Sequence, residues 1–282
     1  MLTYELHRLD CRQPKENNRV INLHNHSTWS DGKYPPDQLV EIGLQSGLTH
    51  IGLSDHFFTK KMFLHRTFVD SDQLDDYITD LHRTAEQFAG QINVLAGIEV
   101  DWSARARPKL AALWDQIDRL DYILFEYVED LEWHGDSLES LLTIRPRISI
   151  PVGLAHNHLS KNFGPHYTVA ELIHALEEYD IFVELSTNPF TTYYTSTDPY
   201  NIRLWQAFAN SNVRFSIGSD THGFATDIAR VKSAHEFLEK RGLLRQLITE
   251  WWDPSQRSWT ERAGHKPVIK VDRPTRIDYP RT

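Results

Sequence analysis

The stretch NLHNHSTWSDG, residues 22–32, sets two histidines directly after a short, mainly apolar run at residues 19–23. A run of that kind is typical of a strand buried on both faces of a parallel sheet. Side chains two residues apart on an extended segment point the same way, so we expect His24 and His26 to face one point. Two imidazoles placed in this way can bind a single metal ion.

Pairs of histidines separated by one residue are weak signals on their own. The chain holds 15 histidines in 282 residues, and chance alone gives about one such pair. Here a second pair, His156 and His158, also follows an apolar run. Each of the apolar runs is short, nearly continuous and rich in Ile, Val or Leu, and we predict strands at 19–23, 50–54, 93–98, 122–125, 150–155, 181–185 and 214–219.

Between these runs lie longer segments in which apolar residues recur at helical spacing. The alternation of strands and helices predicts an α/β protein, either a barrel or a doubly wound sheet. The predicted helices span residues 36–47, 70–89, 108–120, 137–144, 168–179, 200–209 and 228–241.

Metal-competent side chains follow five of the predicted strands. The carboxyl ends of parallel strands meet on one face, where ligands and catalytic groups are found. Imidazole and carboxylate together suit Zn²⁺, Mn²⁺ or Fe²⁺, and the set is too large for one ion. We therefore expect two or three metals and at least one bridging carboxylate among His24, His26, Asp55, His56, Glu99, His156, Asp220 and His222.

Five motifs in this order resemble the PHP family, the polymerase-and-histidinol-phosphatase metallohydrolases. They are NLHNHSTWSDG (22–32), LSDH (53–56), GIE (97–99), GLAHNH (153–158) and GSDTH (218–222), and the resemblance covers roughly residues 19–240. It implies a distorted (β/α)7 TIM-like barrel with two or three divalent ions, Mn, Zn or Fe, at the carboxyl ends of the strands.

The resemblance also implies roles for individual residues. One metal would be held by His24, His26, Glu99 and Asp220. Glu99 would bridge to a second ion that also binds His156. A third ion would be held by Asp31, His56 and His222. Of these residues, Glu99, Asp220 and His222 are the ones that we expect to act in catalysis.

The sequence departs from the family pattern at the fourth strand, which usually ends in a histidine. Glu126 lies two residues before the position of that histidine, so on a strand its side chain points the same way. It can therefore take the place of the histidine as an oxygen ligand. His134 is the other candidate. Asn157 stands where the family usually has proline, which leaves His158 either touching substrate or merely exposed. Asp55 and Glu184 are expected to orient neighbouring histidines rather than to bind metal, so the predicted ligands are His24, His26, Asp31, His56, Glu99, Glu126, His156, Asp220 and His222.

Composition limits the remaining choices. A formal net charge of −9 argues against a general nucleic-acid or anionic-membrane surface, and no apolar run is long enough to span a membrane. With a single cysteine, Cys11, and no hydrophobic leader, we expect a cytoplasmic protein. Residues 254–282 carry seven Lys or Arg against three acids, so we predict a barrel over 1–253 and a basic C-terminal extension that packs on it or trails from it.

The function that we expect is a metal-dependent phosphoesterase for a small phosphorylated metabolite or nucleotide. Two metals about 3.5–4 Å apart would activate a bridging water for attack on phosphorus. The alternatives are a hydrolase of C–N or C–O bonds, such as amides or lactones, and a metal-binding barrel without activity. The cations that could bind the phosphate are Lys60, Lys61, Arg105, Arg107 and Lys161. Aromatic residues also follow the strands, where they either stack on substrate or close the mouth of the barrel: Phe57, Phe58, Trp102, Phe163, Phe190, Tyr193 and Tyr194.

Overall fold

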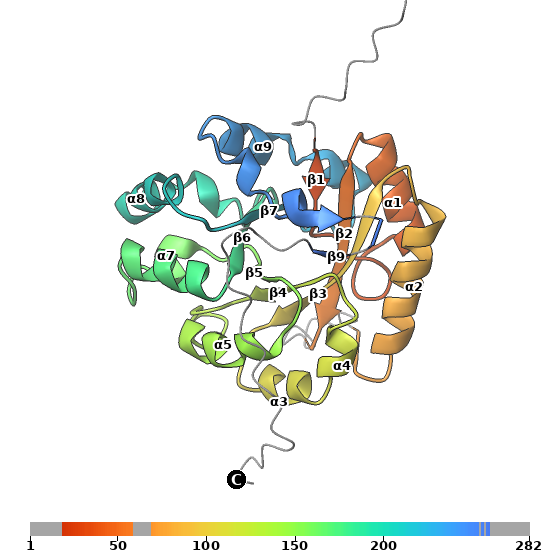
Figure 1. The fold of residues 1–282 in the computed structure, drawn as a ribbon, viewed down its shortest axis with the longest axis horizontal. Helices are drawn as coiled ribbons and strands as arrows, with labels where there is room; N and C mark the ends of the chain where they lie inside the picture. The colour runs from red at the N-terminus through yellow and green to blue at the C-terminus, as the bar shows by residue number, and fades with distance from the viewer. Residues whose placement is uncertain (1–18, 59–68, 254, 257, 260–282) are drawn as a thin grey trace, which may run out of the picture.

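The computed structural model describes residues 19–58, 69–253, 255–256 and 258–259. Within these residues one parallel sheet runs from β1 to β7, and its spatial order follows the chain order (Figure 1). Every strand that the sequence predicts is present, with ends shifted by a few residues. The strands are β1 (Ile21–Asn22), β2 (His50–Phe57), β3 (Asn93–Asp101), β4 (Tyr122–Glu126), β5 (Val152–Leu154), β6 (Ile181–Ser186) and β7 (Phe215–Gly218).

The first and last strands of the sheet approach each other and nearly close it. The Leu23 backbone N–H donates to the Ile217 carbonyl at 2.7 Å, and the Asp220 N–H donates to the His24 carbonyl at 2.9 Å. A doubly wound sheet would instead reverse its strand order near the middle. The sequential order and the near closure confirm the (β/α)7 barrel and exclude the doubly wound alternative.

The helices lie around the outside of the strands (Figure 1). The predicted segment 108–120 is two short helices, and 228–241 is a 3₁₀ turn at Ala225–Ala229 followed by a helix. One further short helix, Leu159–Asn162, was not predicted. The helices are α1 (Pro36–Gln45), α2 (Leu74–Gln87), α3 (Ala106–Ala111), α4 (Trp114–Ile117), α5 (Leu138–Ile144), α6 (Leu159–Asn162), α7 (Val169–Glu178), α8 (Pro199–Phe208) and α9 (Lys232–Glu239).

Local side-chain chemistry fixes where two of these helices begin. The Thr168 hydroxyl accepts the Glu171 N–H, and the Glu171 carboxylate accepts the Thr168 N–H, which makes a complete capping box at α7. The Asp198 carboxylate accepts the Asn201 N–H at 2.9 Å at the start of α8. These contacts satisfy backbone donors that have no partner inside the helix.

Glycines on neighbouring strands make room for large rings in the core. A Cβ on Gly97 would lie 2.3 Å from the Tyr122 ring, and one on Gly153 would lie 2.1 Å from the Phe182 ring. Both rings are fully buried, and the Tyr122 hydroxyl donates to the Leu23 carbonyl at 2.6 Å. Side chains from β4 and β6 therefore pack directly against the backbones of β3 and β5.

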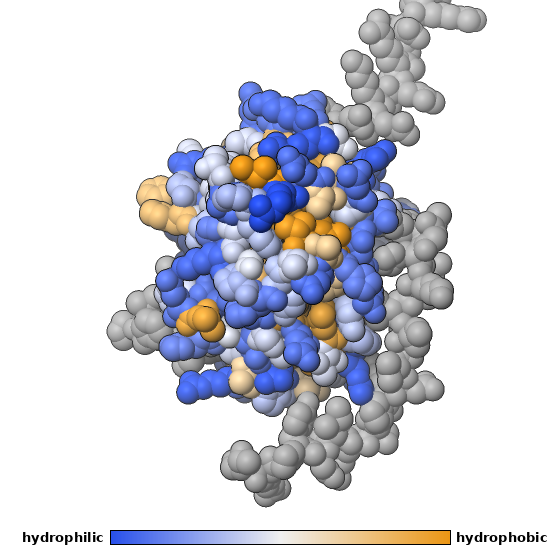
Figure 2. Space-filling model, turned by 90° about the vertical axis from the view of Figure 1, so that its left-hand side faces the viewer, coloured by the Kyte–Doolittle hydropathy of each residue, from blue (hydrophilic) through white to orange (hydrophobic). Residues whose placement is uncertain are grey.

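The outer surface over α7 and α8 is mostly hydrophilic, with apolar groups in small, separate patches (Figure 2). This is the pattern expected of amphipathic helices whose apolar faces cover the barrel. None of the helices in the described residues is both long enough and apolar enough to cross a membrane.

A two-stranded hairpin follows the barrel. The strands β8 (Trp252–Asp253) and β9 (Ser258–Trp259) pair in antiparallel fashion, and the Trp259 indole N–H donates to the Asp121 carbonyl at 2.8 Å. Nearly all of the predicted extension, 254–282, lies outside the described residues, so the boundary at 253 stays a prediction.

Candidate metal centre

The chain turns sharply just beyond four of the strands. Phe58, Tyr127, His156 and Asp220 follow β2, β4, β5 and β7 within two residues, and their φ angles are 55°, 62°, 30° and 50°. Left-handed backbone is unfavourable for a residue with a Cβ and is concentrated at functional sites. Here it redirects side chains at the carboxyl ends of the strands.

Glu99, on β3, lies at the centre of the histidines. Its Oε1 is 3.3 Å from His24 Nε2 and 2.9 Å from His156 Nε2. Its Oε2 is 2.9 Å from His56 Nδ1 and 3.5 Å from His26 Nε2. Each carboxylate oxygen therefore faces its own pair of imidazoles, which is the arrangement expected of a bridging ligand.

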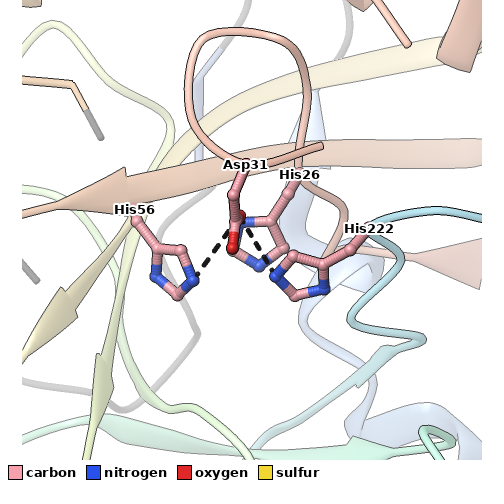
Figure 3. Close-up of side chains that lie close together, drawn as sticks. All are labelled: His26, Asp31, His56 and His222. Atoms are coloured by element: carbon pink, nitrogen blue, oxygen red, sulfur yellow. Dashed lines mark ion pairs between the residues drawn. The ribbon is translucent and has the colours of Figure 1, made fainter. Parts of the chain in front are cut away.

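A second carboxylate gathers a group nearer the opening. Asp31 Oδ1 lies 3.2 Å from His222 Nε2, 3.8 Å from His56 Nε2 and 3.9 Å from His26 Nδ1. Figure 3 shows these four side chains converging: His26 and Asp31 come from the segment after β1, His56 from β2 and His222 from the segment after β7. His222, with 26% of its side chain exposed, is the most accessible of them.

The structure brings all nine predicted ligands together. Four overlapping groups contain them, and within each group the ligand atoms lie within 4.8 Å of one another. Because the groups share members, they describe one continuous cluster rather than separate sites. The groups are His26, Asp31, His56 and His222; His24, His26 and Glu99; His24, His156 and Asp220; and His56, Glu99 and Glu126.

Glu126 and His134 were the two candidates for the missing fourth-strand histidine. Glu126, the last residue of β4, is fully buried, and its carboxylate oxygens lie 3.6 Å from His56 Nδ1 and 3.7 Å from His156 Nε2. His134 lies in the loop beyond β4 and belongs to none of the four groups. The geometry thus favours Glu126, and its role as a ligand stays a prediction.

Glu184, on β6, contacts two of the histidines on the side away from the other ligands. Both of its carboxylate oxygens lie 3.0 Å from His24 Nδ1, and Oε2 also accepts the His156 backbone N–H at 3.0 Å. The His24 ring therefore keeps Nε2 directed at Glu99. A carboxylate behind a metal-binding histidine fixes its tautomer and orientation.

Asp55, on β2, has a similar supporting position. Its carboxylate accepts backbone N–H groups from Ser27 at 2.7 Å and Ser30 at 3.1 Å, and it accepts both serine hydroxyls. These bonds hold the loop that carries Asp31. Asp55 belongs to none of the four ligand groups.

The buried histidines of the cluster differ in charge. Burial, together with His222 and His56, lowers the pKa of His26 to about 3. Burial opposes charge on His156 as well, but the contact with Glu99 outweighs it and raises the pKa of His156 to about 9. Burial likewise disfavours ionised Glu99, yet the neighbouring histidines hold its pKa well below the usual range. In each case burial opposes the charged form, and the charges of the neighbouring groups decide whether the pKa rises or falls.

Several buried polar atoms of the cluster have ion-pair contacts with one another but lack a well-aligned hydrogen bond in the described part of the chain. Both carboxylate oxygens of Glu99 and both ring nitrogens of His56 are buried and have no well-aligned hydrogen bond within the described residues. Leaving such groups unsatisfied is costly. Divalent ions would satisfy them, and the mixed nitrogen and oxygen donors suit Zn²⁺, Mn²⁺ or Fe²⁺. The residues present therefore fit the predicted metals.

His158 does not join the cluster. The left-handed backbone at His156 ends the extended segment, so the two side chains do not share a facing. The His158 ring stacks on Tyr193 with centroids 4.4 Å apart, and its Nδ1 accepts the Lys161 N–H at the start of α6.

Three of the five expected phosphate clamps lie within the described residues. Lys161 contacts Glu132 at 2.7 Å, Arg107 contacts Asp136 at 3.0 Å, and Arg105 is exposed. Lys60 and Lys61 lie outside the described residues. Of the predicted mouth aromatics, those fully buried in packing are Phe57, Trp102 and Phe163, whereas Phe190 is 87% exposed.

Three relevant side chains were not identified from the sequence. Asn188 follows β6, and its Nδ2 donates to Asp220 Oδ2 at 2.9 Å. Tyr127 packs against His156, and Trp133 stacks on Tyr127. The position of Tyr127 directly after β4 was the available signal.

A family match accounts for this combination of barrel and cluster. Residues 22–251 match the PHP domain, so the chain belongs to the PHP domain family, and the predicted resemblance is confirmed. The membership supports the expectation of an enzyme, a metal-dependent hydrolase. No curated protein matches the chain.

Solved structures with low sequence identity share the fold. A histidinol phosphate phosphatase from Lactococcus lactis, solved with zinc, L-histidinol and phosphate, is 16% identical, with 79% of this chain and 93% of that chain covered and a TM-score of 0.55. A structure reported for the metal-dependent tyrosine phosphatases YwqE from Bacillus subtilis and CpsB from Streptococcus pneumoniae is also 16% identical. It covers 84% of this chain and 94% of its own, with a TM-score of 0.52.

Proposed function

We propose that the protein is a metal-dependent phosphoesterase that hydrolyses a small phosphorylated metabolite or nucleotide. The observation that carries the proposal is the position of Glu99, whose two oxygens face separate pairs of buried histidines. Family membership supports it, as do the phosphatase activities named for two proteins of the same fold.

The proposed ligand sets overlap at Glu99. His24, His26, Glu99 and Asp220 would hold one ion, and Glu99 with His156 would hold a second. The carboxylate of Glu126 would complete that second position in place of the usual histidine. A third ion would be held by Asp31, His56 and His222, which face one another near the opening.

Bound ions would lower the pKa of a bridging water for attack on phosphorus and offset the charge of the phosphate. The chain itself supplies positioning. Glu184 fixes the His24 ring, Asn188 fixes the Asp220 carboxylate, and Asp55 holds the loop of Asp31. These contacts would hold the proposed ligands in position, and we expect substrate to approach from the side of His222, whose side chain is 26% exposed. We further propose a cytoplasmic location, on the basis of the single cysteine.

The test is phosphate release from a panel of sugar, amino-alcohol and nucleoside phosphates after loading with Mn²⁺, Zn²⁺ or Fe²⁺. We expect turnover of at least one ester and its loss on chelation. Amides and lactones belong in the same panel. Turnover of these compounds alone, or of none, would contradict the proposal.

Variants connect the activity to the cluster. His24→Ala and Asp220→Ala should each lower kcat by at least about 100-fold and reduce bound metal, because each removes a ligand and leaves buried polar groups unpaired. His174→Ala is the matched control, since that histidine is 77% exposed on α7, contacts Glu178 and belongs to none of the four ligand groups. Near-normal turnover in either cluster variant would show that the site is elsewhere.

A further inference from the structure

Side-chain hydrogen bonds join β1 to the segment after β7, where the barrel closes. Four residues take part, and each is at most 3% exposed: Asn22, Asn25, Ser219 and Thr221. We call these residues the closure network. Asn25 separates His24 from His26 in the chain, and Ser219 and Thr221 lie on either side of Asp220. The network is therefore placed to control how these proposed ligands face one another.

Asn22, the last residue of β1, uses its whole amide in this network. Its Oδ1 accepts the His24 N–H at 3.3 Å and the Ser219 N–H at 3.1 Å. Its Nδ2 donates to Ser219 Oγ at 2.7 Å, and to Asn25 Oδ1 and the Ile228 carbonyl at 3.0 Å each. Buried polar groups that are satisfied in this way hold their neighbours in one arrangement. A single side chain thus links the backbone of a proposed ligand to the segment that follows β7.

Ser219 and Asn25 extend the network beyond Asn22. The Ser219 hydroxyl donates to Asn25 Oδ1 at 3.1 Å and lies 2.6 Å from the Thr221 hydroxyl oxygen. The Asn25 Nδ2 donates to the Gly52 carbonyl on β2 at 2.9 Å. The network therefore connects β1 and β2 with the segment after β7.

The backbone at Asp220 depends on support from its neighbours. Its φ of 50° is left-handed, and such backbone persists in a residue with a Cβ only where the surroundings hold it. Both of its neighbours in the chain belong to the closure network. A Cβ on Gly218 would lie 2.4 Å from His24 Cβ, so β7 also approaches the His24 side chain closely. Changes in the network should therefore move Asp220 relative to His24.

We propose that Asn22 is a positioning residue for the metal centre. It bonds the backbone of the segments that carry His24 and Asp220, and it acts through these ligands rather than on the ion. The ion affected is the one that His24, His26, Glu99 and Asp220 would hold. This inference rests on the metal-dependent site of the proposed function.

The alternative is an amide that only stabilises the fold. Its removal would lower the free energy of unfolding, but the folded protein would bind metal with unchanged affinity and geometry. Co²⁺ separates the two roles, since it accepts the same nitrogen and oxygen ligands and its visible absorption reports their geometry. Metal binding is then measured without turnover.

The test is titration of the metal-free protein with Co²⁺ at a temperature where circular dichroism shows each variant to be folded. Asn22→Leu keeps the size of the side chain and removes its hydrogen bonds. It should weaken Co²⁺ binding by at least about tenfold and change the visible spectrum. Asn22→Asp keeps an oxygen that can accept the His24 and Ser219 N–H groups, so it should bind Co²⁺ within about threefold of the wild type.

Asn201→Leu, on α8, is the matched control. Asn201 is 3% exposed, and its Nδ2 donates to the Ser196 carbonyl at 2.7 Å and the Tyr194 carbonyl at 3.3 Å. The same substitution there removes a buried amide without touching the closure network. The affinity for Co²⁺ and the spectrum should match those of the wild type.

Ser219→Ala is a milder variant that carries the test if Asn22→Leu does not fold. It removes the hydroxyl that bonds Asn22, Asn25 and Thr221 and leaves the backbone bonds in place. We expect it to weaken Co²⁺ binding about threefold, with a spectral change in the same direction.

Three results would overturn this inference alone. The first is wild-type affinity and spectrum in the folded Asn22→Leu or Ser219→Ala variant. The second is equal weakening in Asn201→Leu, which would show a general loosening of the barrel. The third is an Asn22→Asp variant that binds Co²⁺ no better than Asn22→Leu. A wild-type protein that binds no Co²⁺ would instead contradict the metal centre, and the proposed function with it.

Discussion

At the scale of the residue, Glu126 distinguishes this chain from the usual family pattern. It places a carboxylate 3.6–3.7 Å from His56 and His156, where an imidazole is usual. A carboxylate adds negative charge and favours harder ions, Mn²⁺ or Fe²⁺, over Zn²⁺.

Substitution of Glu126 tests this position directly. Glu126→Ala should reduce bound metal by about one ion per chain, measured by elemental analysis after dialysis, and Glu126→His should restore it with a shift toward Zn²⁺. Unchanged metal content in Glu126→Ala would show that Glu126 is not a ligand.

His50, at the amino end of β2, predicts a pH dependence of stability away from the metal site. It is buried, with Nε2 3.2 Å from the Asn93 amide nitrogen and Nδ1 2.9 Å from the Thr49 hydroxyl. These contacts suit the neutral ring. Burial, with Arg19 nearby, lowers the pKa of His50 to about 4. In the unfolded chain, His50 is protonated as the pH falls below its ordinary pKa of about 6.5. In the folded protein it stays neutral until a lower pH, so protonation favours the unfolded state.

The stabilisation from His50 should be complete above about pH 6.5 and should fall as the pH drops toward 4. Between pH 7 and pH 5 the loss in unfolding free energy should be about 2 kcal/mol, measured by urea unfolding. Glutamine does not titrate, so the unfolding free energy of His50→Gln should fall by about 2 kcal/mol less than that of the wild type over the same pH interval. Equal losses in the two proteins would contradict the assignment.

Much of the cluster was predictable residue by residue, because His24, His26, His56, Glu99 and Asp220 lie at or just beyond strand ends. Alternation along an extended chain then places their side chains together. The choice between Glu126 and His134 needed coordinates, since both lie at or beyond the end of β4. The direction of His158 also needed coordinates, because it depends on a left-handed turn that sequence periodicity does not encode.

At the scale of the element, the strands were predictable because both of their faces are buried, which gives nearly continuous apolar runs. The four-residue helix α6 is too short to show a helical period, and it begins at the His158 side chain. The spacing of apolar residues in 108–120 shows no break, so the sequence did not predict that this segment divides into α3 and α4.

The packing of Tyr122 on β3 leads to a prediction at this scale. Gly97→Ala should lower the free energy of unfolding by about 1–3 kcal/mol, because its Cβ would lie 2.3 Å from the Tyr122 ring. Gly223→Ala is the control, since a Cβ there meets nothing within 4 Å. Urea unfolding measures both. Equal stability of Gly97→Ala and the wild type would show that the ring can move away without cost.

At the scale of the whole molecule, the cluster links side chains on β2, β3 and β4 with side chains on the segments that follow β1, β5 and β7. Ions bound to the folded state alone should therefore stabilise the entire barrel. Saturation at about 100 times the dissociation constant should raise Tm by roughly 5–10 °C, measured by calorimetry with and without Zn²⁺ or Mn²⁺. His24→Ala should show a smaller increase, and an equal increase in that variant would place the stabilising ions outside the cluster.

The central claim is that the imidazoles and carboxylates gathered around Glu99 bind shared divalent ions. Anomalous diffraction from crystals of the Zn²⁺- or Mn²⁺-loaded protein tests it most directly. We predict two or three anomalous peaks within bonding distance of the clustered side chains, with Glu99 contacting two of them. Peaks only elsewhere on the molecule, or a single ion without Glu99, would contradict it.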